Sequence, residues 1–155
     1  MGYIMDLRKI VGHRPLLMPA SSVLVINDRN QILLQHRRDN GYWGYPGGSN
    51  ELFEDMEDTA RREVLEETGI LCGPLEFFAL KSGESRHYFY PNGDEISGVE
   101  AVYVCREFTG ELKAQESEVT ELGFFDYDNM PENVSPMNID VIDEYFANNR
   151  NAKIR

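Results

Sequence analysis

The segment from Gly47 to Ile70, GGSNELFEDMEDTARREVLEETGI, constrains the fold more than any other part of the chain. Asp55 is suited to begin a helix, because its carboxylate can accept hydrogen bonds from the free N–H groups of the first turn. Gly69 is suited to end that helix, because glycine adopts a left-handed conformation without strain. The segment therefore predicts a helix over Asp55–Thr68, preceded by a glycine loop.

Acids gather on one face of this helix. Glu63, Glu66 and Glu67 lie at positions i, i+3 and i+4, so helical geometry makes them neighbours. A charged helical face is usually only solvated, and composition alone favours that interpretation. Three crowded carboxylates nevertheless repel one another unless a cation lies among them. Their oxygens suit Mg²⁺, with Mn²⁺ or Ca²⁺ as substitutes, so the spacing favours a divalent metal site.

The other side of the helix is apolar. Ala60 and Val64 are four residues apart, with Leu65 beside them, and we expect all three to pack onto a sheet. Before the helix, Gly47 and Gly48 lack a Cβ, so backbone can approach a ligand closely there and a free carbonyl can serve as a metal ligand. The segment thus predicts a helix that docks by one face and presents acids to a cleft.

The rest of the chain predicts mainly strands around this helix. β-branched and alternating residues favour strands, Asn92-Gly93 favours a hairpin turn, and Asn138–Asn148 has the apolar spacing of a helix. Residues 37–48 are expected to form a loop, and the first 20 residues match no clear pattern. The expected fold class is α/β or α+β, a mixed sheet covered by helices, in one domain over residues 1–155. The predicted strands are Ser21–Asn27, Gln31–His36, Leu75–Lys81, Arg86–Tyr90, Ile96–Phe108 and Glu121–Tyr127.

The net charge and the cysteines limit which classes of partner and which compartment are expected. A net charge of -12 argues against a nucleic acid polymer and against an anionic membrane surface, and no apolar run is long enough to span a membrane. A small phosphate-bearing substrate remains open, because a bound divalent cation reverses the charge of one cleft. Cys72 and Cys105 predict free thiols in a reducing cytoplasm, and the three scattered histidines do not suggest zinc.

The acidic segment resembles the Nudix box, G-x5-E-x7-R-E-U-x-E-E-x-G-U, in which U is a bulky aliphatic residue. All nine specified positions are filled, by Gly48, Glu54, Arg62, Glu63, Val64, Glu66, Glu67, Gly69 and Ile70. The resemblance to the Nudix hydrolase family covers about residues 20–148. It implies a mixed sheet between helices and an enzyme that cleaves, with Mg²⁺, a pyrophosphate linkage in a nucleoside diphosphate linked to another moiety.

The resemblance also implies roles for individual residues. Glu63, Glu66 and Glu67 would bind metal and act in catalysis, the Gly47 carbonyl would join them, and Glu54 would be a more peripheral ligand or supporting acid. Arg62, Gly48 and Gly69 would be structural, with Arg62 orienting the glutamates. The general base varies across the family, and Glu118 is favoured here over Glu116 and Glu121. Phe53 stands where glycine is common in the family.

Substrate contacts are less sharply indicated. Arg37 or Arg38 is expected to meet substrate phosphate, although an exposed strand end is as good an interpretation. Tyr88 is a candidate substrate contact, because some diadenosine polyphosphate hydrolases of the family carry a tyrosine at a similar distance, whereas Tyr90 and Trp43 read more simply as packing residues. Markers of the ADP-ribose, NADH and coenzyme A hydrolases are absent. Nucleoside triphosphates, nucleotide sugars and dinucleoside polyphosphates all stay open as substrates.

Two other functions are compatible with the same fold. One is a domain that senses a nucleotide without cleaving it, although such domains tend to carry degraded glutamates. The other is an isomerase acting on a diphosphate lipid precursor, although its characteristic cysteine and glutamate placement is not evident. Surface dimers are common in the family, so a homodimer is compatible with either the enzyme or the sensor.

Overall fold

The central element is strand β1 (Leu16–Val25), which lies beside strand β8 (Glu95–Cys105) in a computed structural model that describes residues 2–149. The two strands run parallel, with ten paired positions from Leu16 opposite Ile96 to Val25 opposite Cys105. The other pairings in this sheet are antiparallel, so the sheet is mixed. Its strand order is β4 (Gly47–Ser49), β1, β8 and β6 (Glu76–Lys81), with β7 (His87–Phe89) also pairing with β8.

Within residues 2–149, smaller antiparallel sheets and three helices complete the fold. Strand β2 (Ile32–Arg37) lies between β10 (Val119–Phe125) and β3 (Trp43–Gly44), and β5 (Leu71–Cys72) pairs with β9 (Phe108–Thr109). The helices are α1 (Tyr3–Val11), α2 (Met56–Thr68) and α3 (Pro136–Asn149), with short 3-10 turns at Glu84–Arg86 and Tyr127–Asn129. None of the helices described between residues 2 and 149 is long and apolar enough to cross a membrane.

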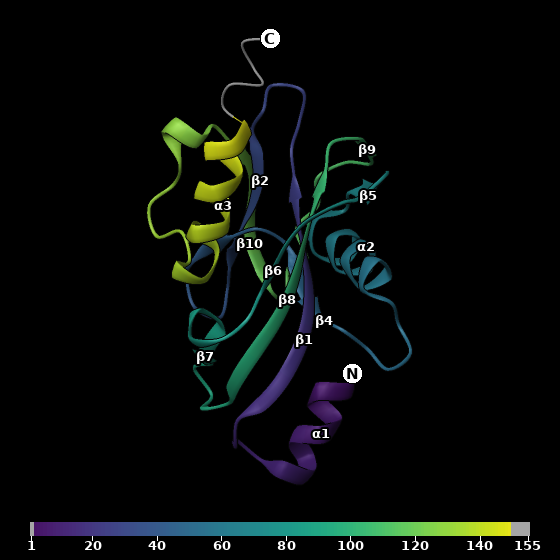
Figure 1. The fold of residues 1–155 in the computed structure, drawn as a ribbon, viewed down its shortest axis with the longest axis vertical. Coiled ribbons are helices and arrows are strands. Elements are labelled where there is room, and N and C mark those ends of the chain that lie inside the picture. The colour runs from purple at the N-terminus through teal and green to yellow at the C-terminus, as the bar shows by residue number, and fades with distance from the viewer. Residues whose placement is uncertain (1, 150–155) are drawn as a thin grey trace.

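The strands lie between α2 and α3 (Figure 1), and each helix covers a core of its own. Side chains alternate along β1, so Val23 and Val25 join the core beneath α2, whereas Leu24 joins the core beneath α3. Ala60 and Val64 of α2 are fully buried in the first of these cores. The expected mixed sheet between helices is therefore confirmed, and its burial on both faces from Ser21 onward explains the apolar run of residues 23–25 at the end of β1.

The predicted helix over Asp55–Thr68 is confirmed as α2. Asp55 caps it by accepting a hydrogen bond from the Asp58 N–H at 2.8 Å, and Gly69 ends it with a φ of 80° in the left-handed region. A Cβ at residue 69 would also meet the carbonyl oxygen of Glu111 at 2.5 Å, so glycine is needed there for space as well as for its backbone conformation. One expectation was wrong, because Leu65 is 46% exposed and turns away from the sheet.

The predicted strands and the predicted helix over Asn138–Asn148 are present with shifted boundaries, and several short elements were not predicted. Strand β1 begins five residues earlier than expected, and the long strand predicted to run to Phe108 stops at Cys105 before β9 begins. Residues 37–48 are not only loop, because they contain β3 and the start of β4. The first 20 residues, which match no clear pattern, form α1 and the start of β1.

Candidate active site

The glycine pair lies between strand β1 and helix α2, and neither residue has room for a side chain. A Cβ on Gly48 would overlap the carboxylate of Glu63, and a Cβ on Gly47 would reach 2.6 Å from the carbonyl oxygen of Ser21. Gly47 is held in place by antiparallel pairing with Ser22 of β1. Gly47 is therefore needed for β4 to lie this close to the backbone of β1, and Gly48 lets β4 approach the Glu63 carboxylate of α2 without displacing it.

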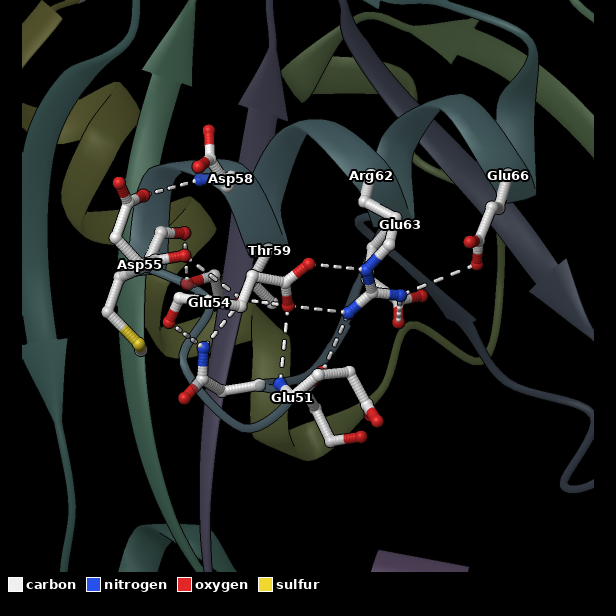
Figure 2. Close-up of polar contacts among 12 residues, drawn as sticks. Glu51, Glu54, Asp55, Asp58, Thr59, Arg62, Glu63 and Glu66 are labelled. Atoms are coloured by element: carbon white, nitrogen blue, oxygen red, sulfur yellow. Dashed lines mark hydrogen bonds and ion pairs between the residues drawn. The ribbon is translucent and has the colours of Figure 1, made fainter. Parts of the chain in front are cut away.

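Arg62 binds the acids on its own side of the helix (Figure 2). Its guanidinium donates to both carboxylate oxygens of Glu54, from Nε at 2.7 Å and from Nη2 at 3.0 Å, and to Glu63 from Nη1 at 2.8 Å. Glu66 lies 3.5 Å from Nη1, and the carbonyl of Ser49 accepts a further bond at 3.0 Å. One planar cation thus connects the loop before the helix to two acids of the predicted metal set.

The same guanidinium explains the charge state of Glu54. Its hydrogen bonds hold the pKa of Glu54 down at about 2, and the Thr59 hydroxyl assists by donating at 2.6 Å. Glu54 is therefore fully ionised at neutral pH and serves as the counter-charge of Arg62. Next to it, Phe53 has a φ of 66°, a conformation that glycine adopts freely, and its side chain is fully exposed.

Glu67 is the deeply buried acid of the site. Only 2% of its surface is exposed, and its carboxylate accepts hydrogen bonds from the Gly47 N–H at 2.9 Å and from the Gln35 side-chain amide at 3.1 Å. Burial, together with the nearby charge of Glu63, raises the pKa of Glu67 to about 8. The pKa of Glu63 is also raised, chiefly by burial, with Arg62 opposing the rise.

These carboxylates fit a divalent cation by their chemistry. Glu63 and Glu67 are oxygen donors whose pKa values are both raised, and the charge of Glu63 adds to the rise at Glu67, which marks a place where positive charge is favoured. In the part of the chain that the structure describes, no three His, Cys, Asp or Glu side chains already converge as a finished metal site. Arg62 contacts Glu63 and Glu66, whereas Glu67 accepts hydrogen bonds from Gly47 and Gln35.

A cavity of about 390 Å³ opens over the glycine pair and the acids. Glu63, Glu66 and Glu67 line it together with Glu118 and Arg37, so five residues of the predicted site share one cavity besides the glycines. Glu118 lies near enough to Glu63 to contribute to its raised pKa. Of the three acids considered as general base, the cavity wall includes Glu118 but neither Glu116 nor Glu121.

The predicted substrate-binding residues lie in different places. Arg37 lines both this cavity and a neighbouring one of about 160 Å³, and it forms a two-bonded ion pair with Asp39, each bond at 3.0 Å. Tyr88 lines the smaller cavity, where its hydroxyl accepts from Asn40 at 3.0 Å. Arg38 lies in neither cavity, because its Nε donates to the Glu116 carbonyl at 2.9 Å.

Several residues of the cavity could not be selected from the sequence. Ile4, Met5 and Arg8 of α1 line its wall, as does Asp94 from the turn before β8. The apolar i, i+3 spacing of Ile4 and Leu7 is a helical signal, although a short one. Gln35, which contacts Glu67, lies among apolar residues of β2, and such a buried amide is a signal that could have been noticed.

Known proteins resemble this chain over most of its length. The NUDIX domain family matches residues 16–145. An ADP-ribose pyrophosphatase of Methanocaldococcus jannaschii is 34% identical over 132 residues, which cover 83% of this chain and 74% of that protein. A NAD-capped RNA hydrolase, NudC, of Vibrio cholerae is 32% identical over 120 residues. That match covers 77% of this chain but 41% of the relative, so the chain spans about two fifths of its length.

Solved structures agree on the fold. The crystal structure of a MutT NUDIX hydrolase from Burkholderia pseudomallei superposes with a TM-score of 0.71 at 24% identity, over 83% of this chain and 97% of the other. Likeness at that identity supports the fold alone, whereas the family match rests on sequence. With every position of the box filled and the glycine pair lying against the acids, the chain belongs to the Nudix hydrolase family.

Proposed function

We propose that this chain is a magnesium-dependent hydrolase that cleaves the pyrophosphate linkage of a nucleoside diphosphate joined to another group. The observation that carries the proposal is the cavity that Glu63, Glu66 and Glu67 line together with Gly47 and Gly48. Nudix hydrolases generally depend on a divalent metal, and one relative is itself named a pyrophosphatase. Nucleoside triphosphates, nucleotide sugars and dinucleoside polyphosphates are the substrate classes considered.

Mg²⁺, or Mn²⁺ in its place, would be held by Glu63, Glu66 and Glu67 with the Gly47 carbonyl, and Glu54 would stay at the periphery. When bound, the metal would lower the pKa of water and neutralise charge on the diphosphate. Arg62 orients two of these carboxylates, since it contacts both Glu63 and Glu66. The hydrogen bonds from Gly47 and Gln35 fix the third, Glu67.

Two further residues act on substrate in this proposal. Arg37 lies at the junction of the two cavities, where its guanidinium can neutralise a phosphate oxygen while Asp39 holds it in position. Glu118 lines the same cavity from the loop before β10, and its carboxylate accepts the proton of the attacking water. In this proposal a proton acceptor and a phosphate ligand lie on the rim of the predicted metal site.

The test is product analysis by chromatography after incubation with MgCl₂ and a panel of ATP, GTP, UDP-glucose, ADP-ribose and diadenosine tetraphosphate. We expect cleavage at a pyrophosphate bond, and a loss of at least about a hundredfold in rate for Glu67→Gln. The matched control is Glu57→Gln, which makes the same charge change on an exposed position of the same helix outside the cavity. Nucleotide binding without cleavage by the wild-type protein would instead favour a sensor.

The net charge and the two thiols support proposals for the kind of substrate and for the cellular compartment. A net charge of -12 suits small nucleotides carried with a cation better than a polyanion, so we propose a small nucleotide-like substrate. Cys72 and Cys105 are free thiols, both buried, which suits a reducing compartment, and we propose the cytoplasm.

A further inference from the structure

Helix α1 contributes almost nothing to the cores of the protein. Among its residues only Arg8 is buried, whereas Ile10 is 83% exposed and Met5 is 48% exposed. Neither hydrophobic core includes a residue of α1. Since burial of apolar surface is what normally holds a helix on a domain, the position of α1 has to be maintained in another way.

Polar contacts hold α1 at both ends. At its N-terminus the Tyr3 N–H donates to Oε1 of Glu51 at 2.8 Å, which places a negative charge where the helix dipole favours it. At its C-terminus the buried guanidinium of Arg8 donates from Nη2 to the Glu95 carbonyl at 2.7 Å, and its Nε lies 3.7 Å from Asp94. The helix is therefore tied to the loop before α2 at one end and to the turn before β8 at the other.

Between these two ties, α1 forms a wall of the cavity that contains the acids. Figure 1 shows the helix alongside the lower half of β1, away from the layers formed by α2 and α3. Ile4 and Met5 line the cavity from α1, and Met18, Tyr90 and Ile96 line it from the sheet and the adjoining turn. The cavity thus has one part formed by carboxylates and another formed mainly by apolar and aromatic side chains.

We propose that α1 is a specificity wall that binds the ring-bearing group which the substrate carries beyond its diphosphate, a sugar or a nucleoside. The inference rests on the proposed hydrolase function and names the class of group that its site accepts. The faces of sugars and bases are apolar and suit Ile4, Met5 and Tyr90. A terminal phosphate does not suit this part of the cavity, because it would meet apolar side chains and the carboxylate of Asp94. The Arg8 guanidinium, which also lines this part, already donates to the Gly12, Arg14 and Glu95 carbonyls and lies against Asp94.

The test replaces apolar side chains of α1 without changing the helix propensity much. Ile4→Gln and Met5→Gln each place a polar group on the wall, and Ile10→Gln makes the same change on the same helix outside the cavity. Kinetics are measured on whichever member of the panel the wild-type protein cleaves fastest. We expect KM to rise by about tenfold for Ile4→Gln and Met5→Gln, with kcat within about twofold of wild type.

Failure of the specificity wall and failure of the hydrolase proposal would give different results. Ile10→Gln is expected to leave both constants unchanged, and equal melting temperatures for all three variants would show that the fold is intact. If wild type cleaves the substrate but Ile4→Gln and Met5→Gln keep the KM of Ile10→Gln, the wall is not a binding surface and the inference is overturned. If wild type cleaves no member of the panel, the hydrolase proposal fails, and the specificity wall fails with it.

Discussion

Replacement of Glu67 by glutamine should stabilise the metal-free protein at alkaline pH. The carboxylate of Glu67 is buried, and its pKa lies at about 8 in the folded protein against an ordinary value of 4.5. Between these two values the folded state binds a proton that the unfolded state has released. The free energy of unfolding therefore falls as pH rises through this window, and the loss is complete above the folded pKa.

The magnitude follows from the size of the pKa change. A rise from 4.5 to about 8 corresponds to roughly 5 kcal/mol of lost stability once Glu67 is ionised. The Glu67→Gln variant would avoid this loss, because the amide oxygen of the new side chain can still accept from the Gly47 N–H. The NH₂ group of the same side chain can donate to Oε1 of Gln35, which has no hydrogen-bond partner within residues 2–149, once the Gln35 side-chain amide flips by about 180°.

The assay is urea unfolding in EDTA at pH 5, 7 and 8.5. Wild type and Glu67→Gln should have similar stability at pH 5, and the variant should become several kcal/mol more stable than wild type by pH 8.5. Glu57→Gln, with its exposed side chain, should follow the wild-type curve at every pH. Parallel curves for wild type and Glu67→Gln between pH 5 and 8.5 would refute the reasoning, because they would mean that burial does not penalise this carboxylate.

Three further predictions concern the same helix and the loop before it. Binding of Mg²⁺ at pH 7 should release about one proton, since Glu67 must ionise to act as a ligand, and calorimetry in buffers of different ionisation enthalpy would detect it. Gly48→Ala should reduce kcat with little change in melting temperature, because its Cβ displaces the Glu63 carboxylate at the end of a flexible side chain; unchanged activity would contradict the close approach. Arg62→Lys should lower kcat/KM by about tenfold with a small change in melting temperature, because an ammonium cannot match the planar guanidinium, and equal steady-state constants would argue against an orienting role.

Much of α2 could be predicted from the sequence because its determinants are local. The cap at Asp55 and the stop at Gly69 lie within one segment, so spacing alone indicates both the helix and its acidic face. The error at Leu65 has a simple cause. The buried stripe of the helix runs through Ala60, Val64 and Glu67, and it is too narrow to include Leu65.

What could not be predicted depends on contacts between distant residues. The position of α1 rests on Glu51 and Glu95, which lie far from it in the chain and belong to no motif with it. The short strands β3 and β4 contain too few residues for alternation to be visible. The deep burial of Glu67 also escaped prediction, because a glutamate in a charged helix is usually solvated and only the packed sheet shows otherwise.

The parallel pairing of β1 with β8 has a consequence for how the chain folds. Its partners, such as Leu16 and Ile96, are eighty positions apart, so the loop between them must close before the central pairing can form. We expect folding dominated by this non-local step to be slower than that of a helical protein of equal size. During synthesis β1 has no partner strand until β8 has been made. The surface on which α2 docks contains residues of β8, so it is incomplete before that point. We therefore expect α2 to dock fully only after β8 has paired with β1.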